Sequence, residues 1–259
     1  MMNELIYVVI TFIATFGGWL VRSLSISGAV AAFFVGLFIS FGFAWKGLII
    51  LGAFFVSSSL WSKLQKHKKE SVLEKVEKGE QRDYVQVLAN GIIPAIISLV
   101  YFFSPSMLWR DMFIVAIAAA NSDTWASEIG SLSKQPPRFI TTWKIVERGT
   151  SGGITFLGTI ASIAGALFIG IVSFVLWNDI YLVLISLFGF FGSIIDTWIG
   201  AVGQANYRCF VCGVETEKKQ HCGQRTIRIK GWRFMNNDMV NWLSILSATI
   251  LYFFVTKLQ

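Results

Sequence analysis

The chain has 259 residues, of which 54% are hydrophobic and only 14% are charged, and its net charge is +7. This composition excludes a soluble domain with a large core and indicates a polytopic membrane protein. The first apolar segment has neither a basic leading region nor a small-residue cleavage site. We therefore expect a retained helix and not a signal peptide.

Eight apolar segments are candidate transmembrane helices. They cover residues 4–21, 27–44, 47–62, 84–103, 108–127, 153–177, 180–203 and 237–256. The third segment is short, so seven spans with one re-entrant segment is the alternative. We expect an all-α fold of about eight helices, in which residues 1–259 form a single integral membrane domain.

Basic residues concentrate in the connections on one side of these spans. Of the 22 Lys and Arg residues, 19 fall at Arg22 or within residues 63–83, 128–152 and 204–236. Cytoplasmic loops of membrane proteins are rich in Lys and Arg, so these connections are expected in the cytoplasm. The pattern predicts a multi-pass protein of the cell membrane with its functional site facing the cytoplasm, and we expect no nucleic-acid partner.

Residues 63–83 alternate acids and bases, which is typical of a solvated helix or hairpin. Polar residues then continue into the fourth span, where Arg82, Gln86 and Asn90 lie four residues apart and share one helix face. They are candidate substrate-binding residues. Polar contacts between helices are the alternative role for them.

The fifth span ends in the sequence DTWASEIG, which begins at Asp123, and the seventh ends in DTWIGAVG, which begins at Asp196. A carboxylate inside a membrane helix costs several kcal/mol unless it is paired, hydrated or bound to metal. Two aspartates in the same motif are therefore predicted to form one site. The motif also suggests that the fifth and sixth helices and the seventh and eighth helices form a parallel repeat.

Further oxygen donors surround both motifs. Carboxylates and amide oxygens are ligands that Mg²⁺ takes, and we expect Asp123, Asp196 and Asp238 to hold it. The other polar residues near the motifs are predicted to bind the substrate, and they are Asn121, Ser127, Glu128, Gln204, Asn237 and Asn241.

The loop after the first motif is basic and ends in the sequence RGTSGG, which opens the sixth span. Glycines, hydroxyls and a cation at a helix N-terminus are how proteins hold phosphate. We expect Thr150, Gly152 and Gly153 to contact phosphate groups. Lys144 and Arg148 are predicted to neutralise charge on the transferring phosphate.

The second long loop contains Cys209, Cys212, His221 and Cys222. A C-x2-C pair with a later Cys and His suits tetrahedral Zn²⁺, which would be structural here. His221 and Cys222 are adjacent, so both bind one ion only if the chain bends sharply between them. Reduced surface thiols without metal are the alternative.

These features together suit a magnesium-bound polyphosphate that is handed to, or taken from, a lipid head group. Two other classes stay open from the residues alone. One is a transporter, in which the aspartates line a path for a cation or a proton. The other is a scaffold protein without enzymatic activity, in which the aspartates only support helix packing.

The segments GEQRDYVQVLANG, NSDTWASEIG, RGTSGG, GSIIDTWIGAVGQ and NNDMVNW occur in this order. A chain with these segments in this order resembles the transmembrane protein 19-like (DUF92-type) family of integral membrane proteins, which includes the plant phytyl-phosphate kinases. The chain is more distantly similar to polyprenol kinases and CDP-lipid synthases. The resemblance implies a kinase that converts a phytyl, geranylgeranyl or farnesyl monophosphate into the diphosphate with a nucleoside triphosphate, CTP favoured, and Mg²⁺. A CDP-lipid cytidylyltransferase and an ion-coupled transporter of a lipid phosphate are the alternatives.

Overall fold

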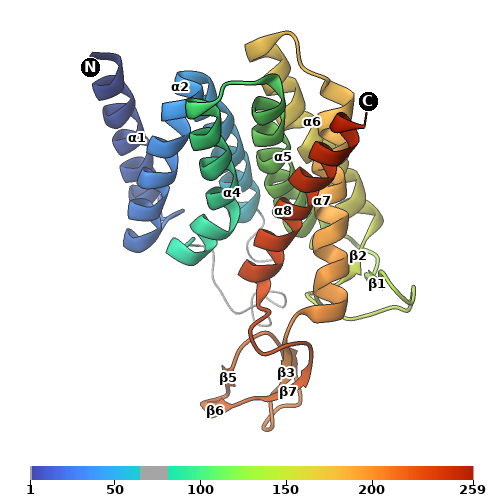
Figure 1. Cartoon of the computed structure of the whole chain (residues 1–259). Coiled ribbons are helices and arrows are strands. Elements are labelled where there is room, and N and C mark those ends of the chain that lie inside the picture. Colours follow the sequence, from blue (N-terminus) through green and yellow to red (C-terminus); the bar gives the residue numbers. More distant parts are fainter. Residues whose placement is uncertain (1, 65–80, 259) are drawn as a thin grey trace.

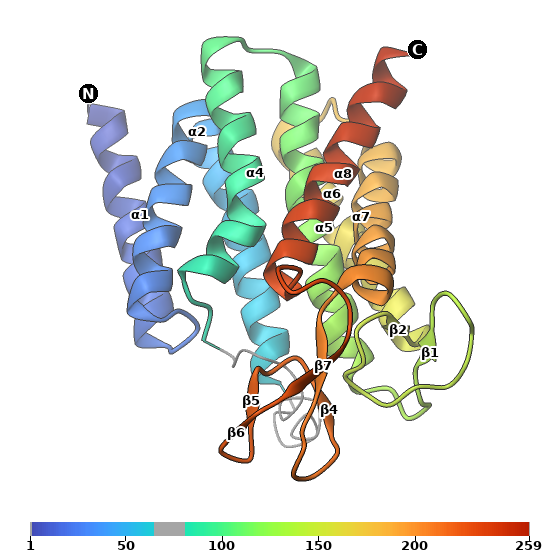
Figure 2. The same cartoon turned by 60° about the horizontal axis from the view of Figure 1, so that its bottom comes forward.

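A computed structural model describes residues 2–64 and 81–258 of the chain as a bundle of long helices (Figure 1). The helices in this part of the chain are α1 (Met2–Leu20), α2 (Ile26–Lys63), α4 (Tyr84–Phe103), α5 (Met107–Gly130), α6 (Phe156–Trp177), α7 (Leu182–Gly203) and α8 (Asn237–Lys257). Both ends of the chain lie at one end of the bundle, and the long loops lie at the other, which we call the loop end (Figures 1 and 2).

Helix α2 reverses its direction at Ala44, where φ is 50°. Its first half starts at the loop end, since Gly28 packs against the backbone of Arg82. Phe43 reaches the opposite end and stacks on Phe113, with 4.4 Å between ring centroids. The second half then returns to the loop end. The predicted break between segments 27–44 and 47–62 coincides with this reversal.

Helix α5 is the centre of the bundle, because it contacts α2, α4, α6, α7 and α8, and residues 110–122 are all buried. Small residues let α7 approach α5 closely. A Cβ atom added at Gly192 would lie only 2.4 Å from the Cβ of Ala119. This close approach brings the C-terminal halves of α5 and α7 side by side.

The membrane-spanning character of the bundle rests on its apolar helices. Among the described residues, α2, α4, α6, α7 and α8 are long and apolar enough to cross a membrane. Many large apolar side chains on their outer faces are exposed, as lipid contact requires. The chain is therefore a mostly helical, polytopic membrane protein, whereas the number of eight spans and the parallel repeat stay predictions.

The loop end contains short strands that the all-α prediction did not include. They are β1 (Arg138–Phe139), β2 (Gly153–Ile154), β3 (Asn206–Arg208), β4 (Glu215–Thr216), β5 (Gln220–His221), β6 (Gln224–Arg225) and β7 (Ile227–Lys230). They pair antiparallel as β1–β2, β4–β3–β7 and β5–β6. The prediction for residues 63–83 falls mainly on positions 65–80, which lie outside the described residues.

The opposite end of the bundle has an ion-pair cluster. Arg110 donates from Nε to Asp111 at 3.1 Å and from an Nη atom to Asp179 at 2.8 Å. The hydroxyl of Tyr252 donates to the second oxygen of Asp111 at 3.1 Å. These contacts neutralise charges that the sequence places far from the long loops.

Candidate active site at the loop end of the bundle

The two motif aspartates meet between α5 and α7. Their side chains are in hydrogen-bonding contact with each other. Asp196 also accepts hydrogen bonds at Oδ2 from Ser244 at 3.0 Å and, when the amide of Asn241 is turned to donate, from Asn241 at 3.0 Å. The prediction that the repeated motif forms one site agrees with this geometry.

A cavity of about 400 Å³ opens beside the two aspartates and gathers most of the predicted residues. Those that line it are Arg82, Gln86, Asn90, Asp123, Ser127, Glu128, Arg148, Thr150, Gly152, Gly153, Asp196, Gln204, Asn237, Asp238 and Asn241. They come from α4, α5, α7 and α8, from the residues just before α4, and from the 128–152 and 204–236 connections with the start of β2. The cavity is therefore a site where distant parts of the chain converge.

Two predicted residues lie elsewhere. Asn121 is buried between helices, where its oxygen accepts from Ser57 at 3.1 Å and its NH2 donates to the carbonyl of Gly165 at 2.7 Å. It precedes Asp123 by two residues, which turns it to the far side of α5. Lys144 is exposed, and its backbone carbonyl accepts from Phe139 at 2.8 Å within the β1–β2 loop.

Three helices direct their N-termini toward the cavity. Asp83 caps α4 and forms a capping box with Gln86, Thr155 caps α6, and Asn236 caps α8. The first turn of each of these helices lines the cavity. The partial positive charge at a helix N-terminus attracts anions, so three of them together favour a polyanionic ligand.

The RGTSGG turn is held against α7 by its glycine. Gly152 has φ of 88°, and a Cβ atom there would lie 2.5 Å from the Cβ of Ala201. A larger residue would be both strained in its backbone and blocked by α7. The turn thereby holds Arg148 at the cavity, where this exposed side chain donates to the carbonyl of Lys134 at 3.1 Å.

Arg82 and Glu128 also line the cavity. Arg82 donates to Ser59 at 2.8 Å, and Glu128 accepts from Ser62 at 2.6 Å. Burial lowers the pKa of the Arg82 guanidinium, and the nearby Glu128 carboxylate opposes that change. Both residues therefore have partners within the protein in addition to their place at the cavity.

Sequence reasoning missed a chain of contacts between the two loops. Ser151 donates to Gln204 at 2.7 Å, and Gln204 donates to Glu217 at 2.6 Å. Glu217 lines the cavity, but nothing in its sequence context indicates this. Ser244, which contacts Asp196, was detectable, because it follows Asn241 by three residues and shares its helix face.

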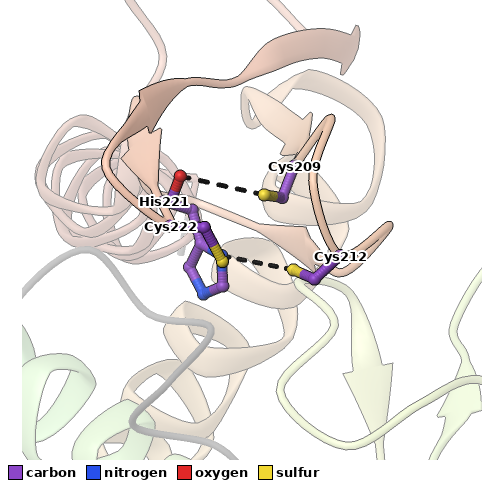
Figure 3. Close-up of side chains that lie close together, drawn as sticks. All are labelled: Cys209, Cys212, His221 and Cys222. Atoms are coloured by element: carbon purple, nitrogen blue, oxygen red, sulfur yellow. Dashed lines mark hydrogen bonds between the residues drawn. The ribbon is translucent and has the colours of Figure 1, made fainter.

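The four predicted zinc ligands converge outside the cavity (Figure 3). Their ligand atoms all lie within 4.8 Å of one another. The imidazole Nδ1 of His221 is 3.4 Å from the sulfur of Cys212 and 3.2 Å from that of Cys222. The backbone N–H of Cys212, more than any other group, lowers the pKa of the Cys209 thiol to about 6.

These features define a polytopic integral membrane protein with a polar cavity at one end of its helix bundle. Residues 9–249 match the model of the family described as integral membrane protein DUF92. The chain belongs to this family, which confirms the family predicted from the order of its motifs.

Three curated relatives cover most of the chain. It is 37% identical to an uncharacterized membrane protein of Methanocaldococcus jannaschii, over 70% of the chain and 75% of the relative. It is 31% identical to Protein PGR of Arabidopsis thaliana, over 94% of the chain and 93% of the relative. It is 28% identical to Protein VTE6, chloroplastic, of the same plant, over 90% of the chain and 65% of the relative. No solved structure matches the chain.

Proposed function

We propose that this protein is a membrane-bound kinase that phosphorylates an isoprenoid monophosphate with a nucleoside triphosphate. The main support is the meeting of Asp123 and Asp196 in one cavity that three helix N-termini also line. Carboxylates suit a metal ion, and helix N-termini suit phosphates. The family resemblance to the plant phytyl-phosphate kinases and the similarity to Protein VTE6 point to the class of substrate.

The donor set of the cavity fits Mg²⁺. Asp123, Asp196 and Asp238 would hold the ion, since all three line the cavity and carboxylate oxygens are its preferred protein ligands. When bound, Mg²⁺ would neutralise negative charge on the phosphates of the nucleotide. Asn241 and Ser244 fix the orientation of the Asp196 carboxylate through their hydrogen bonds.

The basic side of the cavity would bind the triphosphate. Arg148 offers a planar guanidinium that can hold two phosphate oxygens at once. The N-terminus of α6, where Thr155 and Gly158 line the cavity, adds the partial positive charge of the helix dipole. These groups would orient the terminal phosphate toward the acceptor and stabilise charge as it moves between oxygens.

Part of the cavity lining is apolar and would suit an isoprenoid chain. Phe190 and Ile194, one turn apart on α7, and Ile154 of β2 contribute this apolar surface. An apolar chain placed against these residues would lie in the same cavity as the Asp196 carboxylate, with its phosphate directed to the metal site. An oxygen of this monophosphate would attack the γ-phosphorus, the bond to the bridging oxygen of the β-phosphate would break, and the nucleoside diphosphate would leave.

The test is product analysis with purified protein, Mg²⁺ and phytyl, geranylgeranyl and farnesyl monophosphates, each with CTP and the other nucleoside triphosphates. The proposal expects an isoprenyl diphosphate and a nucleoside diphosphate in equal amounts. A CDP-lipid with released pyrophosphate would instead identify a cytidylyltransferase. Ion-coupled flux of the lipid phosphate in liposomes without any nucleotide would identify a transporter.

We propose that the loop end faces the cytoplasm and that the protein lies in the cell membrane. Lys144 is exposed at the loop end, and Lys257 is exposed at the other. In a chain whose three native cysteines are replaced by Ser, a membrane-impermeant maleimide should therefore label Lys257→Cys in intact cells but label Lys144→Cys only after lysis. The opposite pattern would invert the topology.

A further inference from the structure

Cys209, Cys212, His221 and Cys222 come from two tight turns that face each other. The first turn joins β3 to β4, where the N–H of Cys209 donates to Val214 at 2.9 Å and the N–H of Gly213 donates back to Cys209 at 3.0 Å. Gly213 has φ of 76°, which closes this turn. The C-x2-C pair therefore lies on one compact loop with both sulfurs on the same side (Figure 3).

The second turn joins β5 to β6 and explains how the adjacent residues His221 and Cys222 can both bind one ion. Cys222 and Gly223 form the two-residue connection, with φ of 50° and 73°. Two consecutive positive φ values define the tight hairpin turn that matches the twist of paired strands. The sharp bend lets His221 and Cys222 direct their side chains to one point. A non-glycine residue with positive φ is uncommon and indicates a constraint at Cys222.

The distances agree with one tetrahedral ion. Zinc binds sulfur at about 2.3 Å and imidazole nitrogen at about 2.0–2.1 Å, so tetrahedral ligands lie about 3.5 Å apart for sulfur to nitrogen and about 3.8 Å for sulfur to sulfur. The two nitrogen–sulfur distances at His221 are 3.4 and 3.2 Å. No pair of ligand atoms is more than 4.8 Å apart.

We propose that these four side chains bind one structural Zn²⁺ that holds the 204–236 loop together over the cavity. The strands β4, β5 and β6 have only two residues each, and such short hairpins are not stable by themselves in water. One ion bound by two ligands from each turn cross-links them. All four protein ligands are present, so no position stays open for a substrate, as in structural zinc sites.

The zinc-bound loop also reaches the candidate active site. Glu217 lies between the two turns and accepts from Gln204 at 2.6 Å at the edge of the cavity. Lys218 and Lys219 follow it, and their carbonyls accept from Thr226 at 2.7 and 3.1 Å. An ion that holds both turns in place therefore also holds the segment between them, so that Glu217 stays at the cavity.

The first test is metal analysis of the whole protein purified in detergent without chelators. The wild type should contain about one zinc per chain, and Cys212→Ser and His221→Ala should each contain almost none. Val211→Ser is the matched control, because Val211 is exposed on the same turn and is not a ligand, and it should keep its zinc. Absence of zinc in the wild type with three alkylatable thiols, a disulfide within the cluster, or full zinc in Cys212→Ser would each overturn the proposal.

A second measurement follows the loop itself and requires no activity. Trypsin should cut at Lys218 or Lys219 at least about tenfold faster in Cys212→Ser or in chelator-treated protein than in wild type or Val211→Ser, because local unfolding exposes the segment. Restored protection on adding Zn²⁺ to chelated wild type would support the site. Unchanged cleavage after complete zinc removal would show that the ion does not hold the loop. Neither result depends on whether the protein is a kinase.

Discussion

Replacing one motif aspartate by asparagine should abolish activity without unfolding the protein. Asparagine keeps the volume and one hydrogen-bonding oxygen but removes the charge that holds a metal ion. Loss of a metal–phosphate contact costs a few kcal/mol in the transition state, so Asp123→Asn and Asp196→Asn should each lower turnover roughly 10²–10⁴-fold. Residues that act as a unit are not additive, so the double variant should be scarcely worse than either single one.

Although these variants should lose activity, the structure predicts that they do not lose stability when no ligand is bound. Two carboxyl groups in hydrogen-bonding contact share a proton when no metal is bound, because two full charges at about 4 Å would repel each other by roughly 1 kcal/mol in water and 4 kcal/mol at an effective dielectric constant of 20. Asn at position 196 would still accept from Ser244, whose donor atom lies 3.0 Å away. Each variant should therefore unfold at the same temperature as the wild type or a higher one.

The assay is thermal unfolding with and without Mg²⁺ and CTP, in parallel with turnover. Ligand at a hundred times its dissociation constant stabilises the wild type by about 2.7 kcal/mol, and both variants should lose most of this gain. Asp111→Asn is the control on the same helix, because Asp111 pairs with Arg110 and Tyr252 far from the cavity. This control should lower the melting temperature but keep the ligand-induced shift.

Two results would refute the reasoning. If both asparagine variants keep full activity, the aspartates serve helix packing and not catalysis. If Asp196→Asn stays active while Asp123→Asn is inactive, the aspartates do not share a site, and the second motif is only a remnant of duplication.

Three further predictions concern the surroundings of the aspartates. Arg148→Ala should raise the KM for the nucleotide roughly 10–100-fold in steady-state kinetics, and Arg148→Lys should restore only part, since an ammonium does not replace a bidentate guanidinium; equal KM values in all three would exclude a phosphate contact. Ser244→Ala removes one donor to Asp196 and should cost about 1 kcal/mol, or roughly fivefold in kcat/KM. Gly192→Val should lower stability by about 1–3 kcal/mol in denaturant or thermal unfolding, because even its Cβ lies 2.4 Å from that of Ala119.

Membrane physics makes two of the residues that line the cavity recognisable from sequence. A carboxylate is costly in a membrane helix, so Asp123 and Asp196 were recognisable without any structure. Their meeting depends on the close contact of α5 and α7, which rests on small residues such as Ala119 and Gly192. Sequence shows that these residues are small, but it does not show which helices they bring together.

The failures have equally physical causes. Asn121 was assigned to the site by its chemistry, although helical periodicity turns it away from Asp123 and toward Gly165. Lys144 lies in a loop, where no periodicity fixes the direction of a side chain. The paired strands near Glu217 are too short for an alternating pattern to form. Local sequence therefore gives the chemistry of a loop residue but not its partner.

The central claim is that Asp123 and Asp196 hold one metal–nucleotide complex. Binding of Mn²⁺–CTP, followed by electron paramagnetic resonance of the purified protein in detergent, tests it without any lipid substrate. We predict about one tight site in the wild type and none in either Asp123→Asn or Asp196→Asn, since each carboxylate is required for the same ion. Unaltered binding in both variants, or two independent sites of which each variant keeps one, would contradict the claim.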